Sequence, residues 1–332
     1  MSDSDWRPAP RRRIARLLLG LIVFAIAVVL AVRYAIAQQG ALPSIDAANW
    51  PLSVGIAASL FGVMLINGLV LRDLVAHFGV RLHTRAWLGL TLVGSLLNMV
   101  SPVRGGAALR AMYLKRVHDV PLSEIATVLV GSTVCSLAVS AALGAIAIAA
   151  LGVPGGAYGT IALLSSILVA ATLSVLLWAS PPRFAGASPI LARLTRVAAG
   201  WRSLGERPGL LLRLYTWNAL AAILHAIAFL FAFRLASFEG AWLVPIASSA
   251  FARIGTLLAI TPAGLGIFEA FGVVSARIVG AETGAALLGV LAVRVVGTVV
   301  SVAGGLIMLP MLLRDGSSAT SQESLSTRDS RS

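Results

Sequence analysis

The stretch TPAGLGIFEA, residues 261–270, lies between two strongly apolar stretches of the chain. Pro262 has no N–H to donate, and Gly264 and Gly266 allow backbone angles that other residues avoid, so a helix is predicted to break here. Inside a membrane, the backbone groups freed by a break must be satisfied by protein or by a water-filled cavity. The stretch therefore predicts a broken helix with a polar cavity at its tip.

Composition places this break in a membrane. The chain has 332 residues, of which 58% are hydrophobic and 12% charged, whereas about a quarter of residues are charged in ordinary soluble proteins. A helix needs about 20 apolar residues to cross roughly 30 Å of hydrocarbon. The apolar windows are 14–37, 51–71, 86–103, 122–150, 157–180, 214–235, 241–261, 263–280 and 284–313. Two of them, 86–103 and 263–280, are short or broken and need a different explanation.

Lysine and arginine placement predicts the topology, because cytoplasmic loops carry the excess of these residues. Both flanks of 86–103 are basic, whereas the loops on either side of 241–280 carry no Lys or Arg. Each of these two segments is therefore predicted to leave and re-enter the membrane on one side. The predicted fold is an all-α integral membrane protein with about six transmembrane helices and two re-entrant helical hairpins. Both termini are predicted to be cytoplasmic, in a multi-pass protein of the cytoplasmic membrane.

The order of these elements predicts an inverted repeat. Crossing, re-entrant hairpin and crossing occur in that order in residues 51–150 and again in 214–313, and the two sets start on opposite sides. Secondary transporters commonly use this arrangement, with broken helices near the midplane. A single membrane domain, 14–313, is expected between a basic N-terminus, 1–13, and a disordered cytoplasmic tail, 314–332.

The basic segment 181–213 between the halves has two interpretations. Its apolar side chains at helical spacing, with arginines off that stripe, are typical of a helix lying on an anionic membrane surface. A basic cytoplasmic loop with no lipid role explains the charges equally well. The stripe consists of Ile190, Leu194, Val197, Trp201 and Leu204.

Glu269 is the acidic residue of the broken segment. An intramembrane carboxylate is costly enough to require a partner or a protonation role, although a helix-start acid near the interface is also favourable. Arg277 is eight residues away, about 12 Å along a helix, which is too far for a usual same-helix pair. Arg294 or Arg253, from other segments, is therefore expected to be its partner.

The companion stretch SPVRGGAALR, residues 101–110, places Arg104 and Arg110 around the other break. Arginine and loop amides at a helix start suit a phosphate group, whereas positive-inside anchoring explains the same residues without a ligand. Together with Arg253 and Arg294, Arg104 is expected to suit an anionic lipid headgroup. His225 is a candidate proton relay, with packing as the alternative.

Other chemistry is not indicated. His77, His83 and His118 lack a carboxylate framework, and Cys135 is the only cysteine, so neither a metal nor a cofactor is predicted. Phosphate-binding loop, nucleophile-elbow and Rossmann patterns are absent, and no nucleic-acid partner or catalytic residue is expected.

The stretches NMVSPVRGGAALR (98–110), TPAGLGIFEA and VLAVRVVGTVVSVAGG (290–305) carry a family resemblance. The chain resembles, over roughly 14–313, the flippase-like membrane region of lysylphosphatidylglycerol synthases and their stand-alone relatives. The resemblance implies translocation of a modified phospholipid between leaflets without the synthase domain. The chain departs from the family pattern at Ala107, where an acid is typical, and at Gly131 to Ser136, where relatives often carry an acidic and basic cluster.

The function predicted from the sequence is translocation of an anionic or glycosylated lipid, and no enzyme activity is expected. Membrane lipids are the expected partners, and lipid-biosynthesis enzymes are a second class. The alternatives are a membrane-embedded transferase and a scaffold for enzymes that make envelope lipids or glycans.

Overall fold

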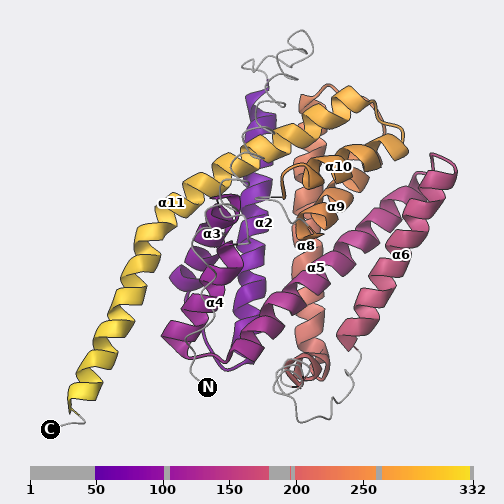
Figure 1. Ribbon diagram of the computed structural model, residues 1–332. Coiled ribbons are helices and arrows are strands. Elements are labelled where there is room, and N and C mark those ends of the chain that lie inside the picture. Colours follow the sequence, from indigo (N-terminus) through magenta and orange to yellow (C-terminus); the bar gives the residue numbers. More distant parts are fainter. Residues whose placement is uncertain (1–48, 101–104, 179–194, 196–198, 259–263, 330–332) are drawn as a thin grey trace, which may run out of the picture.

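The computed structural model describes residues 49–100, 105–178, 195, 199–258 and 264–329, and these residues form helices without any strand. The helices surround a central pair and form an elongated bundle (Figure 1). In chain order they are α2 (Trp50–His77), α3 (Thr84–Val100), α4 (Gly105–His118), α5 (Leu122–Ala150), α6 (Ala157–Trp178), α8 (Pro208–Leu235), α9 (Leu243–Leu258), α10 (Ile267–Ile278) and α11 (Thr283–Asp329).

Five of the described helices are long and apolar enough to cross a membrane: α2, α5, α6, α8 and the part of α11 from Thr283 to Leu312. They match five of the six predicted crossings. The sixth predicted crossing, 14–37, lies outside the described residues. The chain is therefore an all-α, multi-pass membrane protein, as the sequence predicts.

Helices α2 and α8 form the central pair and run antiparallel. Near the middle of α2, a Cβ added at Gly62 would lie 2.8 Å from Leu224 Cδ1. Nearer its end, the indole N–H of Trp217 donates a 3.1 Å hydrogen bond to Asp73 Oδ2. Residue numbers rise along one helix as they fall along the other. The first helix of each predicted repeat thus packs against its counterpart in the opposite direction.

Helices α9 and α10 form a helical hairpin. The Ser248 hydroxyl donates a 2.8 Å hydrogen bond to the Gly272 carbonyl, and a Cβ at Gly255 would lie 3.0 Å from the Ile267 oxygen. These contacts pair the arms in antiparallel order. With 16 and 12 residues, the arms are about 24 and 18 Å long, shorter than the roughly 30 Å of a bilayer core.

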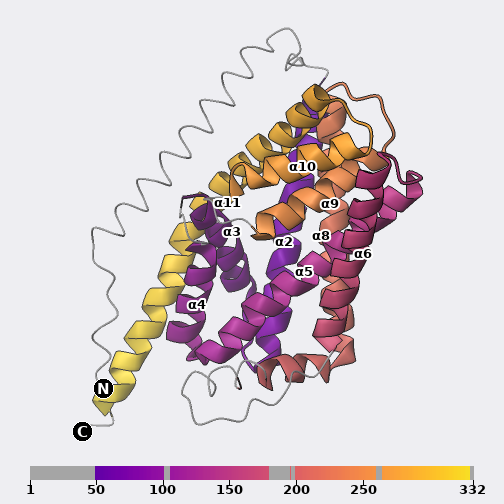
Figure 2. The same ribbon diagram turned by 45° about the vertical axis from the view of Figure 1, so that its right-hand side comes forward.

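Helices α3 and α4 form a second helical hairpin. The Asn98 side-chain oxygen accepts a 2.9 Å hydrogen bond from the Gly106 N–H. A Cβ on Gly106 would overlap the backbone carbonyl of Gly94, so the two arms approach each other at glycine positions. In Figures 1 and 2 the α3–α4 hairpin lies in the lower part of the molecule, and the α9–α10 hairpin lies in the upper part.

Both hairpins pack against α11. A Cβ on Gly272 of α10 would lie 3.0 Å from Val290 Cγ2, and the Ser95 hydroxyl of α3 lies 3.1 Å from the hydroxyl of Ser301. The contacting arms, α3 and α10, run antiparallel to α11, so the tip of each hairpin lies toward the middle of the apolar part of α11. Helix α9 makes the equivalent contact with α5, where Gly144 packs on Phe251. The hairpin of each half therefore packs on the last long helix of the other half.

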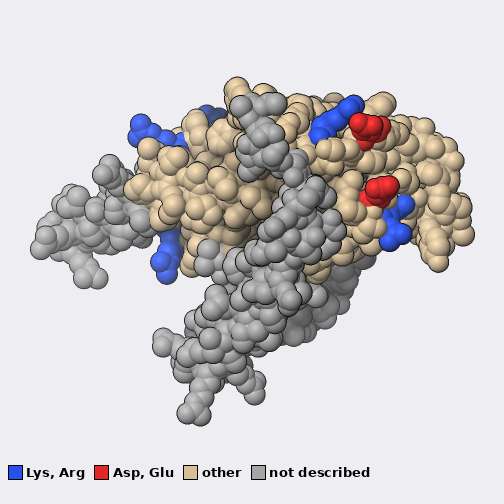
Figure 3. Space-filling model, turned by 90° about the horizontal axis from the view of Figure 1, so that it is seen from above, with Lys and Arg blue, Asp and Glu red and all other residues tan. Residues whose placement is uncertain are grey.

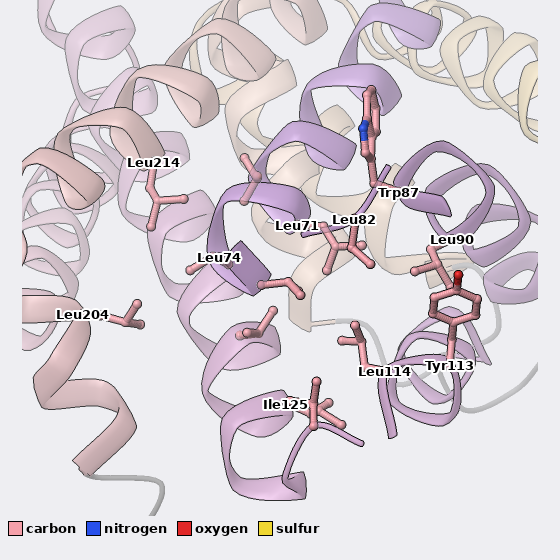
Figure 4. Close-up of a cluster of buried hydrophobic side chains, with 14 of the residues drawn as sticks. Leu71, Leu74, Leu82, Trp87, Leu90, Tyr113, Leu114, Ile125, Leu204 and Leu214 are labelled. Atoms are coloured by element: carbon pink, nitrogen blue, oxygen red, sulfur yellow. The ribbon is translucent and has the colours of Figure 1, made fainter. Parts of the chain in front are cut away.

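The lower part of the bundle has its own apolar core. Side chains from α2, α3, α4, α5 and α8 converge there (Figure 4). Trp201 and Leu204, from the helical stretch 199–205, belong to this core and are 8% and 1% exposed. The Trp201 N–H also donates a 2.8 Å hydrogen bond to the Leu176 carbonyl. These two side chains therefore pack inside the protein, whereas the amphipathic interpretation places them on a lipid surface.

Helix α4 lies outside the apolar windows. The sequence places the first hairpin within 86–103, but its return arm is α4, which lies beyond that window. Arg110, Lys115 and Arg116 interrupt the apolar pattern of α4. Helix α11 extends to Asp329, across most of the segment expected to be disordered, and disorder of that segment in solution stays a prediction.

Candidate functional site

The tip of the α9–α10 hairpin has the backbone that its glycines predict. Gly264 and Gly266 have φ values of 68° and 81°, in the left-handed region that favours glycine. Helix α10 starts at the next residue, Ile267. Pro262 lies outside the described residues. The glycines therefore turn the chain into α10 and leave the first amides of that helix at the hairpin tip.

Glu269 closes this turn. Its Oε2 accepts a 2.7 Å hydrogen bond from the Gly266 N–H. The carboxylate thus satisfies one of the amides that a helix start leaves without a partner, and it lies at the positive end of the α10 dipole.

The other carboxylate oxygen of Glu269 faces Arg294 of α11. Glu269 Oε1 lies 3.3 Å from Arg294 Nε, and the two side chains are 15% and 17% exposed. The guanidinium carbon of Arg294 also lies 5.3 Å from the centre of the Phe268 ring, a cation–π distance. Of the two arginines considered as partners for Glu269, the structure places Arg294 there. The hairpin tip is thereby bonded to the apolar, membrane-crossing part of α11.

Arg253 of α9 lies apart from this ion pair and is 9% exposed. Its guanidinium donates to the hydroxyls of Ser136 and Ser140 at 2.9 and 3.2 Å and to the Ala221 carbonyl at 3.3 Å. Among the described residues it has no carboxylate partner. Two hydroxyl groups of α5 therefore hold this cation in place of a carboxylate. Sequence reasoning missed both serines, although their four-residue spacing in an apolar helix was a usable signal.

His225 of α8 lies among aromatic rings. Its ring centre is 5.0 Å from that of Phe229 and 6.4 Å from that of Phe268. Its Nδ1 is enclosed and has no hydrogen-bond partner in the described part of the chain. Phe268 thus stands between His225 and Arg294. A proton-relay role for His225 stays a prediction.

Arg110 lies within the α3–α4 hairpin. Its Nε is enclosed without a hydrogen-bond partner, and a Cβ on Gly94 would lie 3.7 Å from it. Arg104, the other arginine predicted at this break, lies outside the described residues. The predicted grouping of Arg104 with Arg253 and Arg294 therefore stays a prediction.

The enclosed charges do not balance. Among the described residues, Glu269 pairs with Arg294 only, and the buried acid Asp73 pairs with its neighbour Arg72 at 2.9 Å. Arg253 and the partly buried Arg110 have no acidic partner there. An unbalanced positive charge in a low-dielectric interior favours an anion. The end of the molecule seen in Figure 3 is mostly uncharged and carries acidic side chains beside basic ones. Positive charge without an acidic partner is therefore present inside the described part of the protein as well as on its surface.

Metal chemistry finds no support in the described residues, which contain no group of three or more His, Cys, Asp or Glu side chains suited to a metal ion. Lys115 pairs with Asp119 at the base of α4 and lowers the pKa of that carboxyl. These residues form an ordinary exposed salt bridge.

The comparison with known families agrees with this arrangement. A family model described as the lysylphosphatidylglycerol synthase TM region matches residues 14–305, which include both hairpins and Arg294. No curated protein and no solved structure matches the chain. Because the match covers most of the sequence, the chain belongs to the family of lysylphosphatidylglycerol synthase TM regions.

Proposed function

We propose that this protein moves a lipid with an anionic headgroup between the leaflets of the cytoplasmic membrane. The observation that carries the proposal is the Glu269–Arg294 ion pair, which lies at a broken hairpin tip beside the middle of a membrane-crossing helix. Charged residues at such a position are costly and commonly mark a transport pathway. Arg253 and Arg110 add positive charge that a phosphate group would neutralise.

In the proposed mechanism, the two hairpins are re-entrant and belong to an inverted repeat. Two features support this interpretation: α2 and α8 pack as an antiparallel pair, and the hairpin of each half packs on the last long helix of the other half. The end of the α3–α4 hairpin opposite its tip is cytoplasmic, because the exposed basic residues Arg81, Arg85 and Arg116 occur at the start of α3 and the end of α4. Both termini are cytoplasmic as well. The site opens alternately to each leaflet as the hairpin tips move.

Glu269 and Arg294 are the coupling pair in this mechanism. A headgroup phosphate that reaches Arg294 competes with the Glu269 carboxylate for the same guanidinium. Glu269 keeps its bond to the Gly266 N–H, so binding of the headgroup separates the hairpin tip from α11. The ion pair re-forms when the headgroup leaves, which returns the tip to the arrangement described here.

The experiment is reconstitution into liposomes with fluorescent lipids whose headgroups are anionic, zwitterionic, neutral or glycosylated. Loss of label accessibility measures translocation by the native chain, Glu269→Gln and Arg294→Gln. Glu282→Gln is the matched control, because Glu282 is an exposed acid in the short connection between α10 and α11. We expect headgroup-selective movement that falls at least tenfold in the first two variants and is unchanged in the control.

Two outcomes would reject the proposal. Native protein that moves no lipid would favour a scaffold or a membrane transferase, and a pulldown of lipid-biosynthesis enzymes would then be the next measurement. Movement that survives Glu269→Gln at normal protein levels would remove the coupling role from this ion pair.

A further inference from the structure

The α3–α4 hairpin has a second feature that the Glu269–Arg294 pair does not explain. Gly106, Arg110 and Leu114 follow one another at four-residue spacing in α4, so they share one face of the helix. Gly106 and Leu114 are buried, and this face packs on α3 at Gly94. Arg110 therefore lies on the face of α4 that packs against α3 and is only partly exposed, whereas Lys115 and Arg116 are exposed.

Arg110 carries its charge into this position without compensation. Its Nε is enclosed and has no hydrogen-bond partner in the described residues, whereas the side chain as a whole is only partly buried. Withdrawing part of an unpaired charged group from water costs free energy, and such groups are ordinarily paired. Arginine cannot avoid the cost by losing its proton, because it stays protonated in proteins. A bound anion would supply the missing partner.

Two further donors lie at the same end of the hairpin. Asn98 is exposed, and its Oδ1 is already bonded to the Gly106 N–H, which leaves its NH₂ group as a donor. Helix α4 begins at Gly105, so its positive dipole end lies beside Asn98. Arg110 follows about 8 Å along the helix. The three groups are suited to a single anionic group with several acceptor oxygens.

We propose that Arg110, Asn98 and the start of α4 bind the phosphate group of a phospholipid headgroup. This inference rests on the proposed function, and it adds a phosphate site that is separate from the Glu269–Arg294 pair. Arg110 lies eight residues before the end of α4, about 12 Å along the helix. The exposed residues Arg81 and Arg85, which precede α3 or lie in its first turn, add positive charge that raises the local concentration of anions.

The test measures binding to the full-length chain in a non-ionic detergent by titration calorimetry. The probes are dihexanoyl phosphatidylglycerol, dihexanoylglycerol without a phosphate, and inorganic phosphate. The variants are Arg110→Gln and Arg116→Gln, which remove the same charge from the enclosed and exposed faces of one helix. We expect the native chain and Arg116→Gln to bind the phospholipid within twofold of each other. Arg110→Gln should bind it about tenfold more weakly, as for loss of a charge-assisted contact.

Three outcomes would overturn this assignment. Equal affinity of Arg110→Gln and the native chain would exclude Arg110 from the site. Equal binding of the phosphate-free lipid would show that the acyl chains provide the affinity. Inorganic phosphate that binds as tightly as the phospholipid, and competes with it, would assign the site to a free anion.

A stability measurement separates binding from a structural role. Without ligand, Arg110→Gln is expected to melt at or above the native temperature, because the variant removes a partly buried cation that has no partner among the described residues. A lowered melting temperature would instead mean that Arg110 holds the hairpin together, and the proposal would be wrong. These measurements need no translocation, so they can succeed or fail independently of the liposome experiment.

Discussion

Nη2 of Arg253 in α9 donates a hydrogen bond of 2.9 Å to the hydroxyl of Ser136 in α5. One helical turn later, Ser140 accepts a second bond from the same guanidinium. A cation of the second half is thereby fixed against a helix of the first half by neutral partners only. All of these bonds form only when α9 lies in the position seen here against α5 and α8, so a movement of the α9–α10 hairpin would break them.

Ser136→Asp should convert this contact into an ion pair. Because hydrogen bonds between charged groups are stronger than neutral ones, we expect a gain of about 1–2 kcal/mol in the free energy of unfolding. Neutralising Arg253 should also weaken the binding of anionic lipid. Denaturant unfolding in micelles and lipid titration measure the two effects. Ser136→Asn is the uncharged control, and an aspartate variant no more stable than this control would contradict the prediction.

Glu269 and Arg294 should show a large coupling energy in a double-mutant cycle. Their side chains are mostly enclosed, so each single change to Gln is expected to cost about 2 kcal/mol, between the values for exposed and buried pairs. The double variant should lose less than the sum of the two, by about 1 kcal/mol or more. Additive losses, measured by the same unfolding method, would show that the 3.3 Å approach contributes no stability.

Gly106→Ala should disrupt the α3–α4 hairpin. The new Cβ would overlap the carbonyl of Gly94, and backbone atoms cannot move aside cheaply. We expect a loss of about 3 kcal/mol or more in the free energy of unfolding. Gly284→Ala is the control, because a Cβ there meets nothing within 4 Å, and in α11 the change should be neutral or slightly stabilising. Equal stability of the two variants would show that the hairpin arms do not approach closely.

Trp201→Phe distinguishes packing from lipid association in the basic segment. The change removes the 2.8 Å hydrogen bond to the Leu176 carbonyl and should cost about 1 kcal/mol. Trp178→Phe is the control, since Trp178 is 51% exposed. If both changes were neutral for stability and only Trp201→Phe weakened binding to anionic vesicles, the surface-helix interpretation would be restored.

The sequence predicts most of the long helices because hydrophobic length is a local property. The predicted windows 122–150 and 157–180 end within two residues of α5 and α6. The break at Gly264 and Gly266 is equally local, since glycine's backbone freedom is intrinsic. Arg294 is identified only as one of two candidate partners for Glu269, because sequence does not give the distance between separate helices.

The features missed from the sequence depend on tertiary contacts. Helix α4 is not evident from hydropathy, because two glycines begin it and Arg110, Lys115, Arg116 and His118 interrupt its apolar residues. The role of Ser136 follows from the position of α9, which a single sequence does not supply. From the sequence alone, Arg110 is explained by positive-inside anchoring. Only the structure shows that its Nε lies beside Gly94 and is enclosed.

Helix α11 contacts both hairpins and holds its two contact points at a fixed spacing. Arg294, which contacts the tip of one hairpin, and Ser301, which contacts the other, are seven residues apart on one helical face. Because a helix does not change its length, these attachment points stay about 10 Å apart. A shift of α11 along its axis would therefore change both contacts together. The two hairpins are mechanically linked through this one helix, although they belong to different halves of the sequence.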